Sequence, residues 1–478
     1  MDGWTSKLTE SLFSWSQWPS RMATRHVVIG VLLGFSFSIT STSIAVFFQR
    51  RKKEHQLQQF TPRPIELRSD EIVSGVSGLI GNTPLVRINS LSDALGVEIL
   101  GKAEFLNIGG SVKDRVALQM INDAENQGLI RPYTGSRIFE GTVGSTGISI
   151  ATIARARGYE TTIIMPDDVA QEKVKALQAL GATVERVRPA SIVDKKQYVN
   201  LARQRANKFG EADSIDESDP DFKTQTSHAF HSPSDTVLVT KPSHHVEFNT
   251  TGSVSFEDDE PDQPRGFFAD QFENRSNFDA HYTGTGPEIW RQTNGNLVAF
   301  IAGAGTGGTV AGVGQYLKSM NQGVFVAIAD PEGSGLYNKV KHGVMFDRRE
   351  AEGTKRRHQV DTVVEGIGIN RLTHNIELAL PILDDAFRIT DAEAVAMSRY
   401  LVKHDGLFLG SSSACNLMAC VKLAKQKDWR DGQQIVTILC DSGTRHYSKL
   451  WNDEYLRKAE IPIDLSIVED LLGSPLLP

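Results

Sequence analysis

The chain has 478 residues, 40% of them hydrophobic, and a formal net charge of −7 at pH 7. This length accommodates two or three domains with sizeable hydrophobic cores. The acidic balance provides no basic stripe that could neutralise a phosphate backbone, so we expect no nucleic-acid partner.

The first 65 residues differ in character from the rest of the chain. No charged residue occurs from Val27 to Phe48, and at about 1.5 Å per residue this run can cross a hydrocarbon core about 30 Å thick. The sequence therefore predicts a transmembrane helix over 27–48 within an anchor and linker over 1–65. A cleaved secretory signal is the alternative, but the basic cluster at 50–53 favours a retained anchor with the rest of the chain facing the cytosol.

A helical pattern begins at GGSVKDRVA, residues 109–117. The apolar positions Val112, Val116, Ala117, Met120, Ile121 and Ala124 recur every three or four residues, which predicts a helix that starts at or beside Ser111 as its N-cap. Lys113 falls in the first turn, where the helix dipole disfavours an ammonium group. Lys113 is either a solvated surface residue or an amine that the protein keeps neutral.

Strands and helices alternate from Ser136 to Gly210, and this alternation predicts a parallel sheet flanked by helices in a first α/β domain over 66–210. Between one predicted strand and the next helix lies the turn GTVGSTG, residues 141–147. Its hydroxyls and amides can hold a small carboxylate, or they can simply cap the helix.

Residues 211–265 lose this periodicity and are rich in Ser, Thr, Asp and Pro, so we predict a disordered insertion. The segment contains His228, His231, His244 and His245. No Cys or carboxylate spacing supports a metal site there, and we expect solvated loop histidines.

The α/β alternation returns in a second predicted domain over 266–460, followed by a tail over 461–478. A ligand is expected in a cleft between the two domains, near the carboxyl ends of strands. The cysteines Cys415, Cys420 and Cys440 form no CxxC pair, which indicates reduced thiols and not a disulfide framework or a zinc site.

The glycine-rich loop GAGTGGT, residues 303–309, joins a predicted strand to a predicted helix. Its exposed backbone N–H groups can converge on a phosphate. Gly303, Gly305 and Gly308 also satisfy GxGxxG, with Asp330 at the distance of a ribose-binding acid. A nicotinamide site and a ligand-free tight turn are therefore alternatives.

Ser442 closes the last apolar strand in LCDSGTRH and, taken alone, reads as a turn residue. Together with a neutral lysine, a phosphate loop and a carboxylate-binding turn, however, a serine that contacts a ring nitrogen completes what pyridoxal 5'-phosphate requires of a protein.

In these motifs and their order, the chain resembles the fold-type II pyridoxal-phosphate enzymes, specifically the cysteine synthase and cystathionine β-synthase group. The matching segments, which run from about residue 80 to 447, are IGNTPLVRI, GGSVKDR, EGTVGSTGI, MPDD, DQFEN, TGPEIW, GAGTGGT, DPEGS, EGIG and GSSSA. The resemblance implies a two-domain α/β fold similar to that of the tryptophan synthase β-subunit, and a homodimer.

The resemblance also implies roles for individual residues. Lys113 would bind the cofactor covalently and act as the general base that removes the α-proton. The remaining implied cofactor-binding residues are Ser145, Gly305, Thr306, Gly307, Gly308, Thr309 and Ser442. The implied substrate-binding residues are Thr142, Gly144, Ser145, Thr146, Gln271 and Gly366.

The implied reaction is a β-replacement in which O-acetyl-L-serine loses acetate and sulfide adds to give L-cysteine. The family's carboxylate loop usually reads TSGNT, whereas this chain has Val143 and Ser145 at the Ser and Asn positions. These changes remove or weaken polar contacts, so serine or threonine dehydratase activity, cystathionine β-synthase-type activity and an idle cofactor-binding scaffold are alternatives. On the same family grounds, we favour the mitochondrial outer membrane over the endoplasmic reticulum.

Overall fold

The computed structural model describes residues 72–210, 238–240, 263–347, 362–427, 429–430 and 432–473, together with Phe47. Apart from Phe47, the predicted membrane helix over 27–48 lies outside the described residues. Contacts divide the chain into Met1–Glu66 and Leu67–Pro478, and all the elements below belong to the second unit. Within the described ranges, we find no helix with both the length and the apolar character needed to span a membrane.

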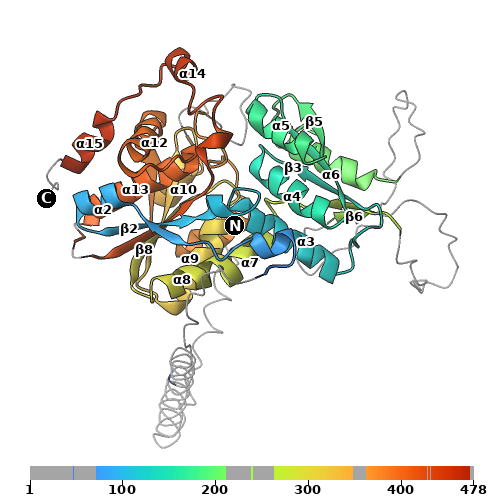
Figure 1. The fold of residues 1–478 in the computed structure, drawn as a ribbon, viewed down its shortest axis with the longest axis horizontal. Helices are drawn as coiled ribbons and strands as arrows, with labels where there is room; N and C mark the ends of the chain where they lie inside the picture. The colour runs from blue at the N-terminus through green and yellow to red at the C-terminus, as the bar shows by residue number, and fades with distance from the viewer. Residues whose placement is uncertain are drawn as a thin grey trace, which may run out of the picture. The chain divides into compact units, whose positions relative to one another are not determined.

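The described strands form two sheets with helices on their faces (Figure 1). The larger sheet has the order β1-β2-β11-β8-β9-β10, in which β1 is antiparallel to β2 and the other pairs are parallel. Its strands are β1 (Leu85–Arg87), β2 (Glu98–Ala103), β8 (Leu297–Gly303), β9 (Phe325–Pro331), β10 (Asp385–Ile389) and β11 (Gln434–Leu439). Parallel strands joined through helices confirm the predicted α/β class.

The smaller sheet has the order β5-β4-β3-β7-β6, with only the edge pair β6 and β7 antiparallel. Its strands are β3 (Arg137–Gly141), β4 (Glu160–Pro166), β5 (Thr183–Val187), β6 (Leu238–Thr240) and β7 (Gly266–Phe268). The strand β6 lies inside the segment 211–265, for which we predicted disorder. Backbone pairing with β7 therefore orders these three residues, although their flanks give no periodic signal.

The two sheets do not follow the predicted domain ranges 66–210 and 266–460. Strands β1 and β2 come from the first range but belong to the larger sheet, and β7, at the start of the second range, belongs to the smaller sheet. The local pattern of a strand shows that the strand is buried. Which sheet the strand joins depends on a hydrogen-bonding partner far away in the chain.

The helices cover both sheets. They are α2 (Asn89–Leu95), α3 (Lys113–Asn126), α4 (Ser145–Ala156), α5 (Gln171–Ala179), α6 (Tyr198–Asn207), α7 (Ser276–Ala280), α8 (Gly286–Gln292), α9 (Gly308–Met320), α10 (Leu336–His342), α11 (His374–Ala379), α12 (Asp391–Asp405), α13 (Ser411–Lys427), α14 (Asp453–Lys458) and α15 (Ser466–Gly473). Short helical turns lie at Val76–Leu79, Glu104–Leu106, His281–Thr285, Leu380–Ile382 and Gly443–Arg445. Helices α3 to α6 lie beside the smaller sheet, while α13 packs on the larger one and α12 packs on α13 (Figure 1).

A shared hydrophobic core joins the two sheets. One buried cluster contains Phe139 and Phe268 from the smaller sheet together with Phe300 and Val326 from the larger sheet. Burial of aromatic and branched side chains from both sheets fixes their relative placement. The segments that follow the strands are thereby held in one arrangement.

The predicted apolar face of α3 is confirmed, because all six of its positions are buried. The helix itself begins at Lys113 with Val112 as its N-cap, one residue later than an N-cap at Ser111 predicts. Ser111 lies in an extended bridge with Asp441 and is not the N-cap, although its Oγ accepts a hydrogen bond from the Lys113 backbone N–H at 3.3 Å. Pairing with a segment distant in the sequence thus overrides the local capping signal.

Candidate active site

A cavity lies where segments that follow strands of both sheets meet the start of α3. Its lining comes from the loops after β3, β7, β8 and β11, from the start of α13 and from the segment around Gly366. The lining residues are Ser111, Val112, Lys113, Thr142, Val143, Ser145, Thr146, Lys173, Gln271, Phe272, Ala302, Gly303, Gly305, Thr306, Gly307, Thr309, Glu365, Gly366, Ile367, Ser412, Asn416, Ile438, Cys440, Asp441 and His446. The position agrees with the expected ligand cleft at strand carboxyl ends.

Lys113 lines this cavity from the first residue of α3. Burial lowers the pKa of its amine below the usual range, and the nearby Cys440 and Asp441 only partly oppose this shift. Among the described residues, we find no group that accepts a hydrogen bond from Lys113 Nζ. The amine is thus a partly desolvated nucleophile and base, not a solvated surface group.

The residues that flank Lys113 in α3 are locked by buried polar contacts. The Asp114 carboxylate accepts hydrogen bonds from the Gly109 backbone N–H at 2.6 Å and from Ser149 Oγ. Burial raises the pKa of Asp114 to about 6, against the effect of these hydrogen bonds. The contacts tie the glycine loop before α3 to α4, so the start of the Lys113 helix cannot rotate freely.

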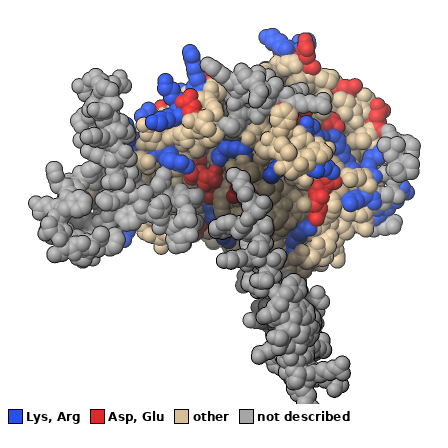
Figure 2. Space-filling view, turned by 180° about the vertical axis from the view of Figure 1, so that it is seen from behind, with Lys and Arg blue, Asp and Glu red and all other residues tan. Residues whose placement is uncertain are grey.

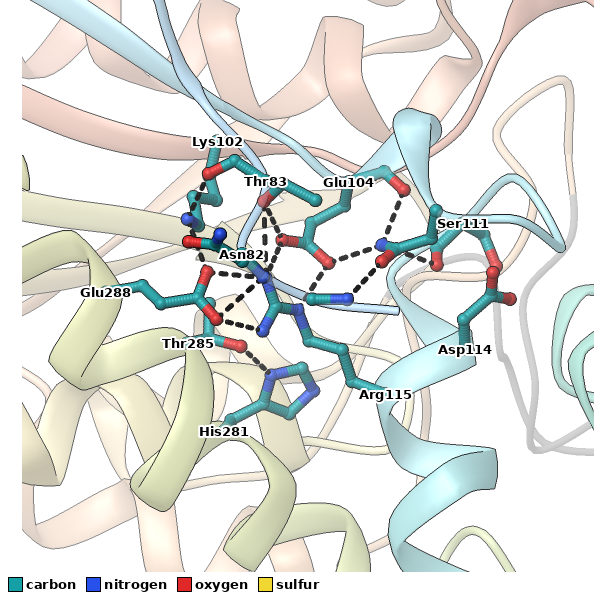
Figure 3. A network of polar contacts seen from close by, with 12 residues as sticks. Asn82, Thr83, Lys102, Glu104, Ser111, Asp114, Arg115, His281, Thr285 and Glu288 are labelled. Carbon is teal, nitrogen blue, oxygen red and sulfur yellow. Dashed lines mark hydrogen bonds and ion pairs between the residues drawn. The ribbon is translucent and has the colours of Figure 1, made fainter. Parts of the chain in front are cut away.

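Arg115, two residues after Lys113, lies at the centre of a buried ionic network (Figure 3). Its guanidinium donates to both oxygens of Glu104, at 2.7 and 2.8 Å, and to both oxygens of Glu288, at 2.7 and 2.8 Å. Lys102 Nζ lies 2.6 Å from the Glu288 carboxylate. Two cations and two anions therefore balance one another, and they connect β2, α3 and α8 behind the cavity.

At its glycine positions, the loop 303–309 passes too close to its neighbours to carry side chains. A Cβ on Gly305 would lie 2.4 Å from the Gly366 carbonyl oxygen, and one on Gly307 would lie 2.7 Å from the Ile376 backbone nitrogen. Gly307 also has φ = 93° and caps α9, which begins at Gly308. The bare loop ahead of a helix N-terminus is a cradle that suits a phosphate.

Four of the five predicted phosphate-binding residues line the cavity, namely Gly305, Thr306, Gly307 and Thr309. Gly308 does not line it. A Cβ on Gly308 would lie 2.1 Å from Asn277 Oδ1, so this glycine lets α9 approach α7.

The predicted carboxylate-binding residues also come together. Thr142, Ser145, Thr146, Gln271 and Gly366 all line the cavity. Thr146 Oγ1 donates a hydrogen bond to Gln271 Oε1 at 2.6 Å, and Gln271 Nε2 donates to the Gly141 carbonyl at 3.2 Å. The hydroxyls and backbone amides at the start of α4 are therefore of the kind that can bind an anion in this cavity.

Gly144, the sixth predicted substrate residue, is not part of the cavity lining. It adopts φ = 135°, and a Cβ there would lie 2.6 Å from Lys173 Cδ. The glycine therefore makes room for the stem of Lys173, whose own side chain reaches the cavity.

The structure does not bring Ser442 into the cavity. Its side chain lies outside the cavity, where Oγ accepts a hydrogen bond from the Thr444 backbone N–H at 3.3 Å. Successive residues of an extended chain point in opposite directions, and here Asp441 bridges to Ser111 while Ser442 bridges to Leu409. Ser412, the second residue of α13, lines the cavity instead. The GSSSA segment, residues 410–414 at the start of α13, was the available signal.

Charged side chains on the cavity wall were also missed from the sequence. Glu365 pairs with Lys173 and, at 2.6 Å, with Lys449. Although burial alone would raise the pKa of Glu365, the two ammonium groups lower it to about 2. The His446 and Asp441 side chains form a second pair, 3.0 Å apart. Glu365 lies in the segment EGIG, and Asp441 and His446 lie in LCDSGTRH, but no role was assigned to these charged side chains from the sequence.

The alternatives to a pyridoxal-phosphate site are weaker. Asp330, the expected ribose acid of a nicotinamide site, is fully buried outside the cavity and accepts a hydrogen bond from the Tyr337 backbone N–H at 2.7 Å. Within the described ranges, no group of His, Cys, Asp or Glu side chains could hold a metal ion. The four histidines of the insertion lie outside those ranges.

On the face shown in Figure 2, basic and acidic side chains are interspersed, without a continuous basic stripe over the described surface.

The residues present fit pyridoxal 5'-phosphate. A desolvated amine, a glycine cradle at a helix N-terminus and a hydroxyl on α13 surround one cavity. These groups supply a covalent attachment point, an anion site and a neutral partner for a ring nitrogen.

Comparisons with known proteins also indicate a pyridoxal-phosphate-dependent enzyme. A family model described as "Pyridoxal-phosphate dependent enzyme" matches residues 76–228 and 235–441. The chain is 52% identical over 404 residues to "Cysteine synthase 2" of Schizosaccharomyces pombe, covering 84% of this chain and 90% of that protein. It is 53% identical over 381 residues to "Cysteine synthase 2" of Emericella nidulans, covering 80% of each. It is 46% identical over 410 residues to "Putative mitochondrial cysteine synthase" of Saccharomyces cerevisiae, covering 85% and 88%.

Proposed function

The chain belongs to the pyridoxal-phosphate-dependent enzyme family, and from this membership we propose that it forms L-cysteine from O-acetyl-L-serine and sulfide. The observation that carries the proposal is the position of Lys113, whose desolvated amine shares one cavity with a glycine cradle and a hydroxyl-lined turn. The relatives named cysteine synthase support the reaction class.

Each part of the cofactor has a group that would hold it. Lys113 would attach it through the amine, the backbone of residues 305–309 would bind its phosphate, and Ser145 would lie near its ring oxygen. We assign the ring-nitrogen contact to Ser412 in place of Ser442. When bound, the cofactor withdraws electrons from the substrate α-carbon, and a neutral hydroxyl at its nitrogen favours β-elimination over transamination.

The chain's own residues would then orient the substrate and move its protons. Thr142, Ser145, Thr146 and Gln271 would bind the amino-acid carboxylate, with Gly366 at the border of the cavity. Lys113 would take the proton from the α-carbon and later return it. The apolar Val143 side chain lies on the same wall, so the turn lacks the hydroxyl that TSGNT would place at this position.

The test is a spectrum combined with a mass measurement. We expect the purified protein to absorb near ~410 to 420 nm, to gain a pyridoxyl mass on Lys113 after borohydride reduction, and to release L-cysteine from O-acetyl-L-serine and sulfide. The Lys113→Ala variant should lose all three signals. A wild-type protein without the adduct would overturn the assignment.

A second candidate reaction is dehydration of L-serine or L-threonine, favoured by the missing hydroxyl at Val143. The same assay without sulfide distinguishes it, because a dehydratase would release a keto acid. With homocysteine as the nucleophile, the assay also tests cystathionine formation.

We further propose that residues 27–48 anchor the protein in the mitochondrial outer membrane with the catalytic unit in the cytosol, and that the protein is a homodimer. The uncharged run followed by a basic cluster supports the anchor, and the name of the Saccharomyces cerevisiae relative supports the organelle. Carbonate extraction of isolated mitochondria should leave the protein in the pellet, whereas a variant lacking 27–48 should be released.

A further inference from the structure

His446 and Asp441 form a buried pair on the cavity wall that the reaction above does not use. His446 Nε2 lies 3.0 Å from Asp441 Oδ2, and the two residues are only 3% and 5% exposed. Both line the same cavity as Lys113. Histidine with a carboxylate partner is the most common proton-transfer unit of enzymes at neutral pH.

Asp441 lies close to the reactive amine. Its backbone pairs with that of Ser111, two residues before Lys113. Burial lowers the pKa of the Lys113 amine, and the negative charge of Asp441 acts in the opposite direction. The pair therefore belongs to the reacting end of the cavity.

A purely structural role leaves two features of the pair unexplained. Asp441 Oδ1 is buried without a hydrogen-bond partner among the described residues, and no partner is found there for Nδ1 of His446. Buried polar atoms normally have partners. A Cβ on Gly410 would lie 2.1 Å from Asp441 Oδ1, so the chain carries a glycine where the pair needs space.

The carboxylate is ionised in this setting. Burial opposes its charge, but His446 and Arg445 hold the pKa of Asp441 below its usual value. The carboxylate at Nε2 keeps the ring in one orientation, which leaves Nδ1 as the atom that exchanges a proton.

We propose that His446, oriented by Asp441, is the proton donor to the oxygen that leaves the substrate β-carbon. The proposal rests on the function proposed above. Lys113 removes the α-proton, the Cβ–O bond breaks with its electron pair on oxygen, and His446 Nδ1 supplies the proton that releases water from L-serine. Hydrogen sulfide then gives a proton back to His446 as its sulfur bonds to the same carbon, and Lys113 returns the α-proton.

The consequence is a wider substrate class. Acetate is a weak base and leaves O-acetyl-L-serine without a proton, whereas the hydroxyl of a β-hydroxy amino acid does not leave unless it is protonated. A site with His446 therefore accepts L-serine as well as the activated ester. The loss caused by a missing proton donor should depend on the leaving group.

The first test compares His446→Gln with the wild-type enzyme on both substrates, with sulfide in excess. We expect kcat for L-serine to fall by about 100-fold, within the usual range for a general acid, and kcat for O-acetyl-L-serine to change by less than about 3-fold. Asp441→Asn should show the same substrate-dependent loss. The exposed Thr444→Ala in the same loop is the matched control and should leave both rates unchanged.

A second measurement does not depend on activity. In protein labelled with ¹⁵N-histidine, the His446 signal, assigned by its absence in the Gln variant, should show a proton on Nε2 and none on Nδ1 in the neutral form. Asp441→Asn should disturb this tautomer. Equal losses on the two substrates, or a neutral ring protonated on Nδ1, would overturn the proposal.

The two proposals fail in different ways. A wild-type enzyme that makes cysteine from O-acetyl-L-serine but none from L-serine overturns the role of His446 alone. An enzyme that makes cysteine from neither overturns the proposed function as well.

Discussion

The Arg115 guanidinium and the Glu288 carboxylate form a two-point ion pair, with Nη1 to Oε1 at 2.7 Å and Nη2 to Oε2 at 2.8 Å. This pair joins the helix of Lys113 to α8 across a long sequence separation (Figure 3). Glu288 also neutralises the fully buried Lys102. One carboxylate therefore holds two buried cations next to the active site.

Glu288→Ala should destabilise the fold by about 3 to 5 kcal/mol, because it removes the anion that pairs with the buried Lys102 and leaves Arg115 with Glu104 alone. Equilibrium unfolding in urea measures this change. The partly exposed Arg87 pairs with Asp93, which is 71% exposed, so Asp93→Ala is the control and should cost less than about 1 kcal/mol. Similar losses for the two variants would mean that the buried network does not contribute as described.

Gly307→Ala should abolish phosphate binding, because the new Cβ meets the Ile376 backbone at a residue with φ = 93°. Gly343 has φ = 77°, and a Cβ added there would have no atom within 4 Å, so Gly343→Ala isolates the effect of backbone conformation. We expect that control to cost only about 1 kcal/mol and to retain the cofactor. Equilibrium dialysis against pyridoxal 5'-phosphate measures both affinities, and equal losses would contradict a steric role for the loop.

Lys113→Met should stabilise the cofactor-free protein at pH 7. Burial lowers the pKa of Lys113, so the folded state binds fewer protons than the unfolded state, and folding costs free energy wherever the unfolded lysine is charged. The advantage of methionine should shrink as the pH rises toward the ordinary lysine pKa of about 10.4. Thermal unfolding of the apoprotein from pH 7 to 10 checks this trend, and a constant or growing advantage would contradict a desolvated amine.

Glu365→Gln should reduce stability at pH 7 by an amount on the order of 3 kcal/mol, from the fall in pKa from 4.5 to about 2. The native pKa is depressed, so this contribution is present above the unfolded pKa and disappears as the pH falls toward about 2. The difference between wild type and variant in acid titrations of unfolding measures it. A difference that persists at pH 2 would show that packing, not charge, stabilises this residue.

Ser412→Ala should weaken cofactor binding and shift its absorption band, because the ring nitrogen loses its hydroxyl partner. Ser442→Ala, in the half-buried position outside the cavity, should change neither. Titration of the apoprotein with pyridoxal 5'-phosphate, followed by absorbance, compares the two. The reverse result would restore the assignment made from sequence.

The sequence predicted the groups that depend on local pattern. The apolar periodicity around Val116 and Met120 located the helix of Lys113, and the glycines before α9 located a loop that lines the cavity, because both signals reside in neighbouring residues. Ser412 lies in the first turn of α13, and Ser442 lies just after β11. Side chains alternate along the extended chain after β11, so Asp441 lines the cavity and Ser442 does not.

Long-range pairing was the part that could not be predicted. The bridge of Ser111 to Asp441 moved the helix start by one residue, and the pairing of β2 with β11 placed an early strand in the larger sheet. His446 and Glu365 reach the cavity only through such pairings. The partners of Glu365 and His446 in the structure cannot be read from neighbouring residues, so a local spacing rule does not connect these two side chains to Lys113.

The place of β11 in the larger sheet has a consequence for synthesis on the ribosome. It hydrogen-bonds to β2 on one side and to β8 on the other, so these strands cannot unite until translation has passed Leu439. A nascent chain that already contains Lys113 therefore has no complete vitamin B6 site. The coenzyme can bind only after nearly the whole polypeptide has emerged from the ribosome. Premature termination before that strand would leave the nascent product unable to retain the vitamin.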